Sequence, residues 1–348
     1  MLESNNIGLI HTPHTDLRNC PMDPSGFNDP TPITDRRQLV DYFMAGCKSK
    51  SDWAIGTAHE KFPFRLSTLK PVQYDEAKGI RDLLQVLKIF GWREIMEGEN
   101  VVGLKRGFAS ITLGPGGQVA MSGAQVQNLH ETAAEIDQHF DELKEVSKLL
   151  DIGFLGLGTH PTATVADLGR SPQALHAIIC AAMPQQGKSG LDMMLRTCGI
   201  RVTLDYADEA DMIRKMRVAT ALQPVATALF AASPFTEGKP NFYQSHRMQL
   251  WQDTDPARCG FLPFVFADDF GFARYVGYAL DAPMYYVLRD GKYINATGQS
   301  FRDFMAGKLP ASPGTTPTVA DWLAEPPAPD VPAEIAQKTS DKYREALV

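Results

Sequence analysis

The strongest constraint on the fold is a short stretch in which apolar and polar residues alternate strictly. In Ile200–Tyr206 (IRVTLDY), apolar side chains occupy every second position, and Arg201, Thr203 and Asp205 lie between them. A period of two indicates a β-strand with an apolar buried face and a polar face. Residues 118–122 (QVAMS) alternate in a similar way. The sequence therefore predicts a sheet that is buried on one side and polar on the other.

Helical periodicity separates the predicted strands. Residues 75–90 carry apolar side chains at helical spacing and are followed by Gly91, a residue typical of a helix end. The clearest helix is predicted over residues 128–150, and another over 209–231, where Pro224 should produce a kink. Strands separated both by helices and by hairpin-like turns favour an α+β architecture over a regular βαβ repeat.

Composition divides the chain into three parts. Residues 1–33 are rich in proline, aspartate and asparagine and show little periodicity, which predicts an extended arm. Residues 34–323 contain the periodic segments and form the predicted folded domain. Residues 324–348 combine a proline- and alanine-rich linker with a predicted terminal helix.

Charge and cysteine content exclude several functional classes. The 34 Lys and Arg against 41 Asp and Glu give a net charge of −7, and no basic stripe is present, so we expect no nucleic-acid partner. The apolar stretches are interrupted by polar residues, so we expect no membrane span. Five widely spaced cysteines and the absence of a signal-peptide pattern predict reduced thiols in the cytoplasm. Assembly into a homo-oligomer is left open.

Two short motifs have both a structural and a functional interpretation. The turn GPGGQ (114–118) lacks the Lys-Ser/Thr of a phosphate-binding loop, which favours a plain glycine turn. The pair His59–Glu60 is either a metal ligand with a base or a hydrogen-bonded pair at a strand end. The N-terminal arm also contains three residues of types that can bind a metal, without a fourth ligand nearby: His11, His14 and Cys20.

Polar residues further along the chain offer a binding site for a carboxylate. Burying Arg201, Thr203 and Asp205 would be costly unless they contact a ligand or one another, and a solvated sheet face is the alternative. Arg247 and Trp251 are four residues apart and share a face if they are helical. An arginine fork suits the two oxygens of a carboxylate. The alternative is a surface arginine resting on a tryptophan.

Several segments together resemble the glutamate–cysteine ligase family of plants and proteobacteria, the first enzyme of glutathione synthesis. These are IGTAHEKFPF (55–64), LGPGGQVAMSG (113–123) and the long run from GLDMMLRTCGIRVTLDY to SPFTEGKPN (190–241), within a resemblance that covers about residues 31–323. It implies a curved antiparallel sheet flanked by helices, of the glutamine synthetase/glutamate–cysteine ligase type. The sheet forms a substrate funnel for glutamate, cysteine and Mg-ATP. The family phosphorylates the γ-carboxylate of glutamate, and the cysteine amine then displaces the phosphate.

The departures from the family pattern fall on acidic positions. Ala58, Gly114 and Ala120 stand where the family has glutamates, and Arg201 and Thr203 replace Gln and Asn. The loss of carboxylates predicts a repurposed homologue that binds a small amino acid in the ancestral pocket. Such a protein would act on its substrate without Mg-ATP, in specialised biosynthesis. Two alternatives remain: a non-catalytic regulatory or binding protein, and a functional glutamate–cysteine ligase, which alone would use Mg-ATP.

The predicted site combines residues from all these motifs, with no metal or cofactor assigned. Predicted catalytic residues are Glu60, His59, Arg201 and Asp205. Predicted contacts to the amino-acid substrate are Arg247, Thr203, Gln118, Trp251, Thr236 and Met194.

Overall fold

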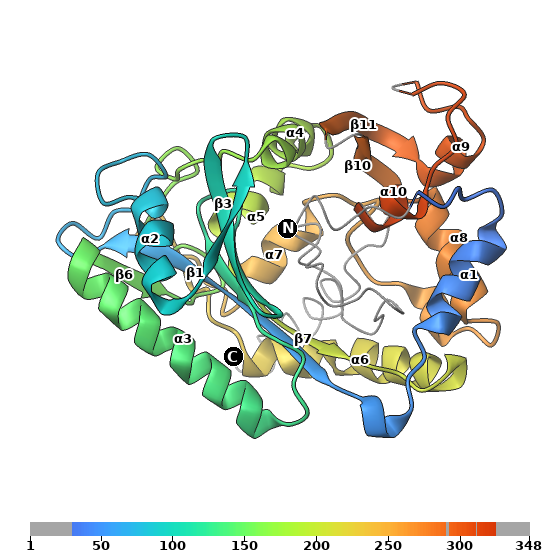
Figure 1. Ribbon diagram of the computed structural model, residues 1–348, viewed down its shortest axis with the longest axis horizontal. Coiled ribbons are helices and arrows are strands. Elements are labelled where there is room, and N and C mark those ends of the chain that lie inside the picture. Colours follow the sequence, from blue (N-terminus) through green and yellow to red (C-terminus); the bar gives the residue numbers. More distant parts are fainter. Residues whose placement is uncertain (1–29, 290–291, 311, 325–348) are drawn as a thin grey trace.

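The computed structural model describes residues 30–289, 292–310 and 312–324 of the 348-residue chain (Figure 1). In these ranges, one sheet of seven strands has the order β2-β3-β4-β5-β1-β6, with β7 also paired to β1. All of its strand pairs are antiparallel, and helices flank it. The predicted α+β architecture is confirmed. The predicted arm and tail lie largely outside the described residues.

The strands of the sheet are β1 (Ile55–Arg65), β2 (Arg93–Glu97), β3 (Asn100–Arg106), β4 (Ala109–Leu113), β5 (Val119–Ser122), β6 (Ile152–Leu155) and β7 (Ile200–Leu204). Two separate hairpins are formed by β8 (Phe235–Thr236) with β9 (Lys239–Pro240), and by β10 (Pro283–Arg289) with β11 (Lys292–Ser300). The α-helices are α1 (Arg36–Ala45), α2 (Ile80–Leu87), α3 (Leu129–Leu150), α4 (Ala174–Ala182), α5 (Gly190–Arg196), α6 (Glu209–Leu229), α7 (His246–Gln252), α8 (Phe272–Asp281), α9 (Phe301–Met305) and α10 (Val319–Ala324).

The long strand β1 organises the sheet. One edge of β1 pairs with β5, and its other edge pairs first with β7 over Ile55–His59 and then with β6 over Phe62–Arg65. Because three strands meet on β1, its central residues lie in the middle of the sheet. Glu60 is one of these residues.

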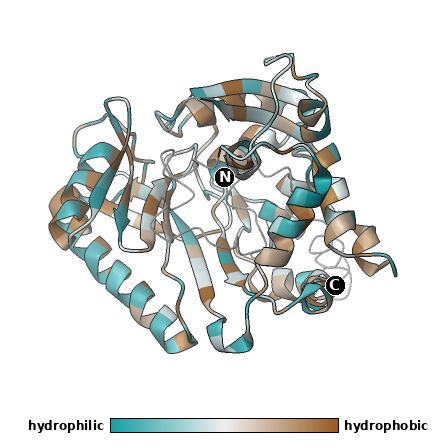
Figure 2. Ribbon diagram, turned by 45° about the vertical axis from the view of Figure 1, so that its right-hand side comes forward, coloured by the Kyte–Doolittle hydropathy of each residue, from teal (hydrophilic) through white to brown (hydrophobic). Residues whose placement is uncertain are grey.

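The helices predicted from periodicity are present. The predicted helix at 128–150 corresponds to α3, which is capped by Asn128 at its start and by Asp151, in a left-handed conformation, after its last residue. α6 is capped by Asp208 and runs through Pro224 as far as Leu229. α3 is the long helix at the lower left of Figure 2, and its visible side is mostly hydrophilic. No helix in the described ranges combines the length and the apolar character that crossing a bilayer requires.

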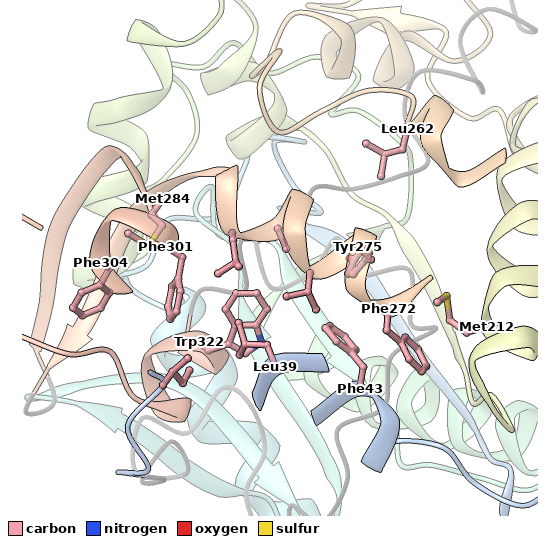
Figure 3. Packing of buried hydrophobic residues seen from close by; sticks show 14 of the residues in the cluster. Leu39, Phe43, Met212, Leu262, Phe272, Tyr275, Met284, Phe301, Phe304 and Trp322 are labelled. Atoms are coloured by element: carbon pink, nitrogen blue, oxygen red, sulfur yellow. The ribbon is translucent and has the colours of Figure 1, made fainter. Parts of the chain in front are cut away.

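Three apolar clusters hold these layers together. One lies between the sheet and the helices α2 and α3, and includes Leu84, Ile111 and Val146. A second is built around α8 with α1, β10 and α10 and includes several aromatic side chains, among them Phe43, Phe272 and Trp322 (Figure 3). The third packs α4, α5 and α7 beneath Tyr285 and Tyr286. This third cluster therefore holds α5 and α7 in place through their buried side chains.

The side of β7 that is buried differs from the prediction. Ile200, Val202 and Leu204 are 79%, 50% and 43% exposed, whereas Arg201 and Thr203 on the other side are half-buried. The period of two is confirmed, but the expectation that the apolar side faces the interior is wrong here. β7 pairs only along β1 within the described residues and so lies at a sheet edge. Its apolar side is open to solvent.

Candidate functional site

The registers of three strands place Glu60, Arg201 and Thr203 on one face of the sheet. Residues directly opposite in an antiparallel pair point to the same side. Ala58 lies opposite Arg201 of β7 and Ser122 of β5, and Glu60 lies opposite Ala120 of β5. We call this side the Glu60 face. The glycine turn after β4 thus places Ala120 directly beside the carboxylate of Glu60.

Glu60 is held by the segment that precedes β7. Its Oε2 accepts a hydrogen bond of 2.7 Å from the backbone N–H of Gly199, and its own N–H donates to the carbonyl of Gly199 at 3.0 Å. These two bonds fix the position of the carboxylate at the start of β7. Gly199 was not among the predicted site residues, although it directly precedes the strictly alternating strand.

Arg247 approaches the same point from α7. Its N–H donates to Ser233 Oγ at 3.0 Å, and its guanidinium carbon lies 5.4 Å from the centre of the Trp251 ring. A Cβ atom built on Gly199 would lie 3.0 Å from Arg247 Nη2 and 3.7 Å from Glu60 Oε2. The helical spacing that predicted a shared face for Arg247 and Trp251 is confirmed by α7. Glu60 and Arg247 therefore converge at Gly199.

The donors around this point have unused hydrogen-bonding capacity. Within the described part of the chain, Arg247 Nε and Trp251 Nε1 are buried atoms without a hydrogen-bond partner, although most buried donors in proteins have one. The thiol of Cys198 lies in the same region, and its pKa is raised by burial first and by the Glu60 carboxylate second. Charged and neutral N–H donors suit the oxygens of a carboxylate.

Arg201, Thr203 and Asp205 do not form one cluster. Arg201 and Thr203 are half-buried on the Glu60 face. Asp205 directly follows the last residue of β7, and its side chain is buried. Its Oδ2 accepts a hydrogen bond from the Ala54 N–H at 2.8 Å, and its Oδ1 forms an ion pair with Lys48 Nζ at 3.0 Å. Asp205 thereby joins the start of β1 to the end of β7.

Gln118 connects the glycine turn to α5. Its Oε1 accepts from the Gly116 N–H at 2.8 Å, and its Nε2 lies 3.0–3.1 Å from three backbone carbonyls at the end of α5, those of Met194, Leu195 and Thr197. Its side chain is only 1% exposed. The side chain of Met194 is fully buried as well. In the β8–β9 hairpin, Thr236 Oγ1 accepts from Asn241 Nδ2 at 2.9 Å.

His59 lies on the opposite face of β1 from Glu60, because adjacent residues of a strand point to opposite sides. Its Nδ1 is hydrogen-bonded to the Lys61 ammonium, and its ring lies 5.5 Å from that of His139 in α3. Burial lowers the pKa of His59 to about 4, and the charge of Lys61 adds to the effect. Burial also lowers the pKa of Lys61, to about 8. The structure therefore separates His59 from the pocket at Glu60. His11, His14 and Cys20 lie outside the described residues.

Comparison with known proteins identifies the family. The model of glutamate-cysteine ligase family 2 (GCS2) matches residues 54–333 of the chain. The chloroplastic glutamate–cysteine ligase of Solanum lycopersicum is 53% identical over 292 residues, which are 84% of this chain and 55% of the relative. Glutamate–cysteine ligase A of Oryza sativa subsp. japonica is also 53% identical, with 84% and 58% covered, and the Arabidopsis thaliana ligase is 51% identical, with 84% and 55% covered. The chain thus spans little more than half the length of these relatives.

These similarities correct two expectations and confirm a third. The prediction of a repurposed homologue that acts without Mg-ATP is contradicted, because relatives that share half of the aligned positions are named as glutamate–cysteine ligases. The predicted cytoplasmic location is contradicted as well, since the same relatives are named chloroplastic. The family resemblance seen in the sequence is confirmed: the chain belongs to glutamate-cysteine ligase family 2.

Proposed function

We propose that this chain has the activity for which its relatives are named, the joining of glutamate and cysteine by an amide bond at the expense of ATP. The observation that carries the proposal is the 53% identity over 292 residues with named glutamate–cysteine ligases. The matched region of the family model contains the whole Glu60 face together with α5 and α7. The segments that build the pocket are therefore those that the chain shares with the family.

The substrate carboxylate in this proposal is bound by Arg247. Its guanidinium retains a buried Nε that has no partner among the described residues, and Trp251 presents a buried indole N–H beside it. A two-oxygen ligand between these donors would satisfy both of them, and an arginine fork binds a carboxylate through two parallel bonds. Gly199 leaves room for the contact, since a side chain there would meet Arg247 Nη2.

The reaction in this proposal makes the γ-carboxyl group of glutamate electrophilic before the amide bond forms. ATP transfers its terminal phosphoryl group to a γ-carboxylate oxygen. The cysteine amine then attacks the carbonyl carbon, a C–N bond replaces the C–O bond to phosphate, and inorganic phosphate leaves. The amine also loses a proton. Glu60 is the carboxylate placed to accept it, because Gly199 holds its Oε2 at the point where Arg247 converges.

In the register of β1 with β5, Glu60 is the acidic side chain that the Glu60 face offers to a magnesium ion. Magnesium takes oxygen ligands in octahedral geometry, with one or two carboxylates supplied by the protein. The described part of the chain contains no group of three or more His, Cys, Asp or Glu side chains that could hold a metal. On the Glu60 face, Ala58 and Ala120 lie next to Glu60, at positions where the family resemblance implies glutamates. The roles proposed above therefore rest on the chain's own groups.

The decisive experiment measures binding and turnover on the same preparation. The purified chain is incubated with glutamate, cysteine and Mg-ATP, and γ-glutamylcysteine and ADP are quantified by mass spectrometry. Calorimetry measures the binding of glutamate separately. The proposal expects product, glutamate binding, and weakening of that binding by about tenfold or more in Arg247→Ala, the loss of a charge-assisted contact. Ser67→Ala, on an exposed turn away from the pocket, is the matched control.

Two results would separate the alternatives. Glutamate binding without any product would contradict the ligase and favour a binding or regulatory protein. Absence of both glutamate binding and product would contradict the proposed substrate as well as the proposed reaction.

A further inference from the structure

The tip of the β8–β9 hairpin has an unusual residue for its backbone conformation. Glu237 and Gly238 connect the two strands and have φ angles of 51° and 77°. Two-residue turns with two positive φ angles favour Asn-Gly, Asp-Gly or Gly-Gly. A glutamate in the left-handed region is uncommon and destabilises the local backbone. A contact made by the Glu237 side chain can offset this cost.

That contact is an ion pair with a buried arginine. Arg196, the last residue of α5, has a side chain that is 3% exposed, and its Nη1 lies 3.1 Å from Glu237 Oε1 and 3.0 Å from Asp192 Oδ1. A second bond fastens the same turn, because the Gly238 N–H donates to the Pro161 carbonyl at 2.9 Å. Asp192 and Glu237, whose side chains are 32% and 52% exposed, share the charge of this buried guanidinium, and loss of Glu237 would leave it with Asp192 alone. The hairpin tip is thus fixed to α5.

The other end of the hairpin is bonded to the first turn of α7. Asn241 Nδ2 donates to the Ser233 carbonyl at 3.0 Å and to Thr236 Oγ1 at 2.9 Å. Ser233 Oγ in turn accepts the N–H of Arg247 at 3.0 Å. The unit from residue 233 to residue 241 therefore has the Glu237–Arg196 pair at its tip and the backbone of Arg247 at its base.

We propose that Glu237 is a positioning residue for substrate binding: by fixing the hairpin to Arg196, it holds Ser233 where Ser233 orients Arg247 toward the substrate carboxylate. This inference rests on the proposed function for the identity of the substrate. Glu237 itself does not contact the reacting groups. Its contribution is to the geometry of Arg247, so it acts on substrate affinity more than on the rate of the chemical step.

The test uses Glu237→Gly. This variant removes the carboxylate and at the same time suits the positive φ angle, so it keeps the turn and is not expected to unfold the protein. We expect the KM for glutamate to rise about tenfold while kcat stays within about twofold, as for the loss of a charge-assisted contact that affects only binding. Glu237→Gln, which keeps an acceptor for Arg196, should recover part of the affinity. Lys239→Ala on the same hairpin is the control and should leave both constants unchanged.

A second measurement does not depend on catalysis. Hydrogen exchange of the free protein, followed by mass spectrometry, reports on the Arg247 amide that donates to Ser233 Oγ. Glu237→Gly should speed exchange in the peptide covering residues 242–252 about tenfold relative to Lys239→Ala. Unchanged exchange there would overturn the inference even if the chain makes no γ-glutamylcysteine. A KM equal to that of the wild type would overturn it if the ligase is active. Absence of ligase activity in the wild type with faster exchange in Glu237→Gly would count against the proposed function alone.

Discussion

Lys61 offers a quantitative test of the structure, because its charge is buried beneath α3 without a carboxylate partner in the described part of the chain. Its side chain is 4% exposed and lies on the opposite side of β1 from Glu60. The ammonium is hydrogen-bonded to His59 Nδ1 and lies 5.1 Å from the centre of the Phe140 ring. Burial lowers its pKa from the ordinary value of 10.5 to about 8, and the nearby Cys198 thiol opposes the shift only in part. The charged form is therefore unfavourable in the folded protein.

The perturbation is Lys61→Met, which keeps the length of the side chain and removes the charge. The pKa falls from 10.5 to about 8, and each factor of ten in proton affinity corresponds to about 1.4 kcal/mol. The buried charge therefore lowers the free energy of unfolding by about 3 kcal/mol at pH 7. Methionine also loses the contacts to His59 and Phe140, worth about 1 kcal/mol together. We expect Lys61→Met to be more stable than the wild type by about 2 kcal/mol at pH 7.

The sign of the pH dependence follows from proton linkage. Between about pH 8 and pH 10.5, the unfolded chain holds a proton on Lys61 that the folded chain has released, so the free energy of unfolding rises with pH in this window. The penalty is complete below about pH 8 and disappears above 10.5. Buried tyrosines also titrate at high pH and should affect the wild type and the variant equally. Burial raises the pKa of the Cys198 thiol and the charge of Lys61 lowers it, so this thiol titrates at a higher pH in the variant. The advantage of Lys61→Met should therefore shrink steadily from about pH 8 to pH 10.5.

The assay is urea denaturation followed by tryptophan fluorescence, at about pH 7 and at several values up to about pH 10. Lys70→Met, at an exposed position, is the control for the change in composition and should differ from the wild type by less than about 0.5 kcal/mol. If Lys61→Met is less stable than the wild type at neutral pH, or if the difference between them does not depend on pH, the reasoning about a buried charge is refuted.

Three further predictions concern the pocket. Gln118→Leu leaves buried backbone groups at the end of α5 and in the glycine turn without partners, so we expect the free energy of unfolding in urea to fall by about 3 kcal/mol. A fall of less than about 1 kcal/mol would contradict the role of Gln118 in joining the turn to α5. Gly199→Ala places a methyl group 3.0 Å from Arg247 Nη2, and should weaken glutamate binding in calorimetry about fivefold, whereas unchanged binding would show that the ligand lies elsewhere. The double variant Ala58→Glu/Ala120→Glu adds two carboxylates beside that of Glu60 and should create an Mn²⁺ site that electron paramagnetic resonance detects. If no Mn²⁺ binds, these three positions on the Glu60 face are too far apart to share a metal.

The sequence was informative about elements and family because both depend on local patterns. The stripe of apolar residues between 128 and 150 predicted α3 to within one residue at its start. The spacing of Arg247 and Trp251 predicted their shared helical face, because residues four apart on a helix are always neighbours. The motifs at 55–64, 113–123 and 190–241 sufficed to identify the family, since each is a contiguous run of residues.

The candidate site was only partly predictable because its members come from segments that approach one another in three dimensions. Glu60 and Arg247 were predicted, but Gly199 and Ser233, which hold and orient them, carry no chemical signature of their own. Carboxylates are indeed absent at Ala58, Gly114 and Ala120, yet the inference from this to a non-ligase function is contradicted by the relatives. Such an inference requires knowing what other groups the pocket contains, and residue types alone do not show this.

The sequence by itself determined the strand period, the helix positions and the family, since side-chain alternation and capping are properties of neighbouring residues. Only the tertiary structure decided which side of each strand is used. His59 and Glu60 are adjacent in the chain, but His59 packs under α3, whereas Glu60 is bonded to Gly199 on the other face of the sheet. Ile200 and its apolar neighbours on β7 are exposed, although their pattern predicted burial. A period of two specifies that faces alternate, whereas the register with β1 and the edge position of β7 specify what each face meets.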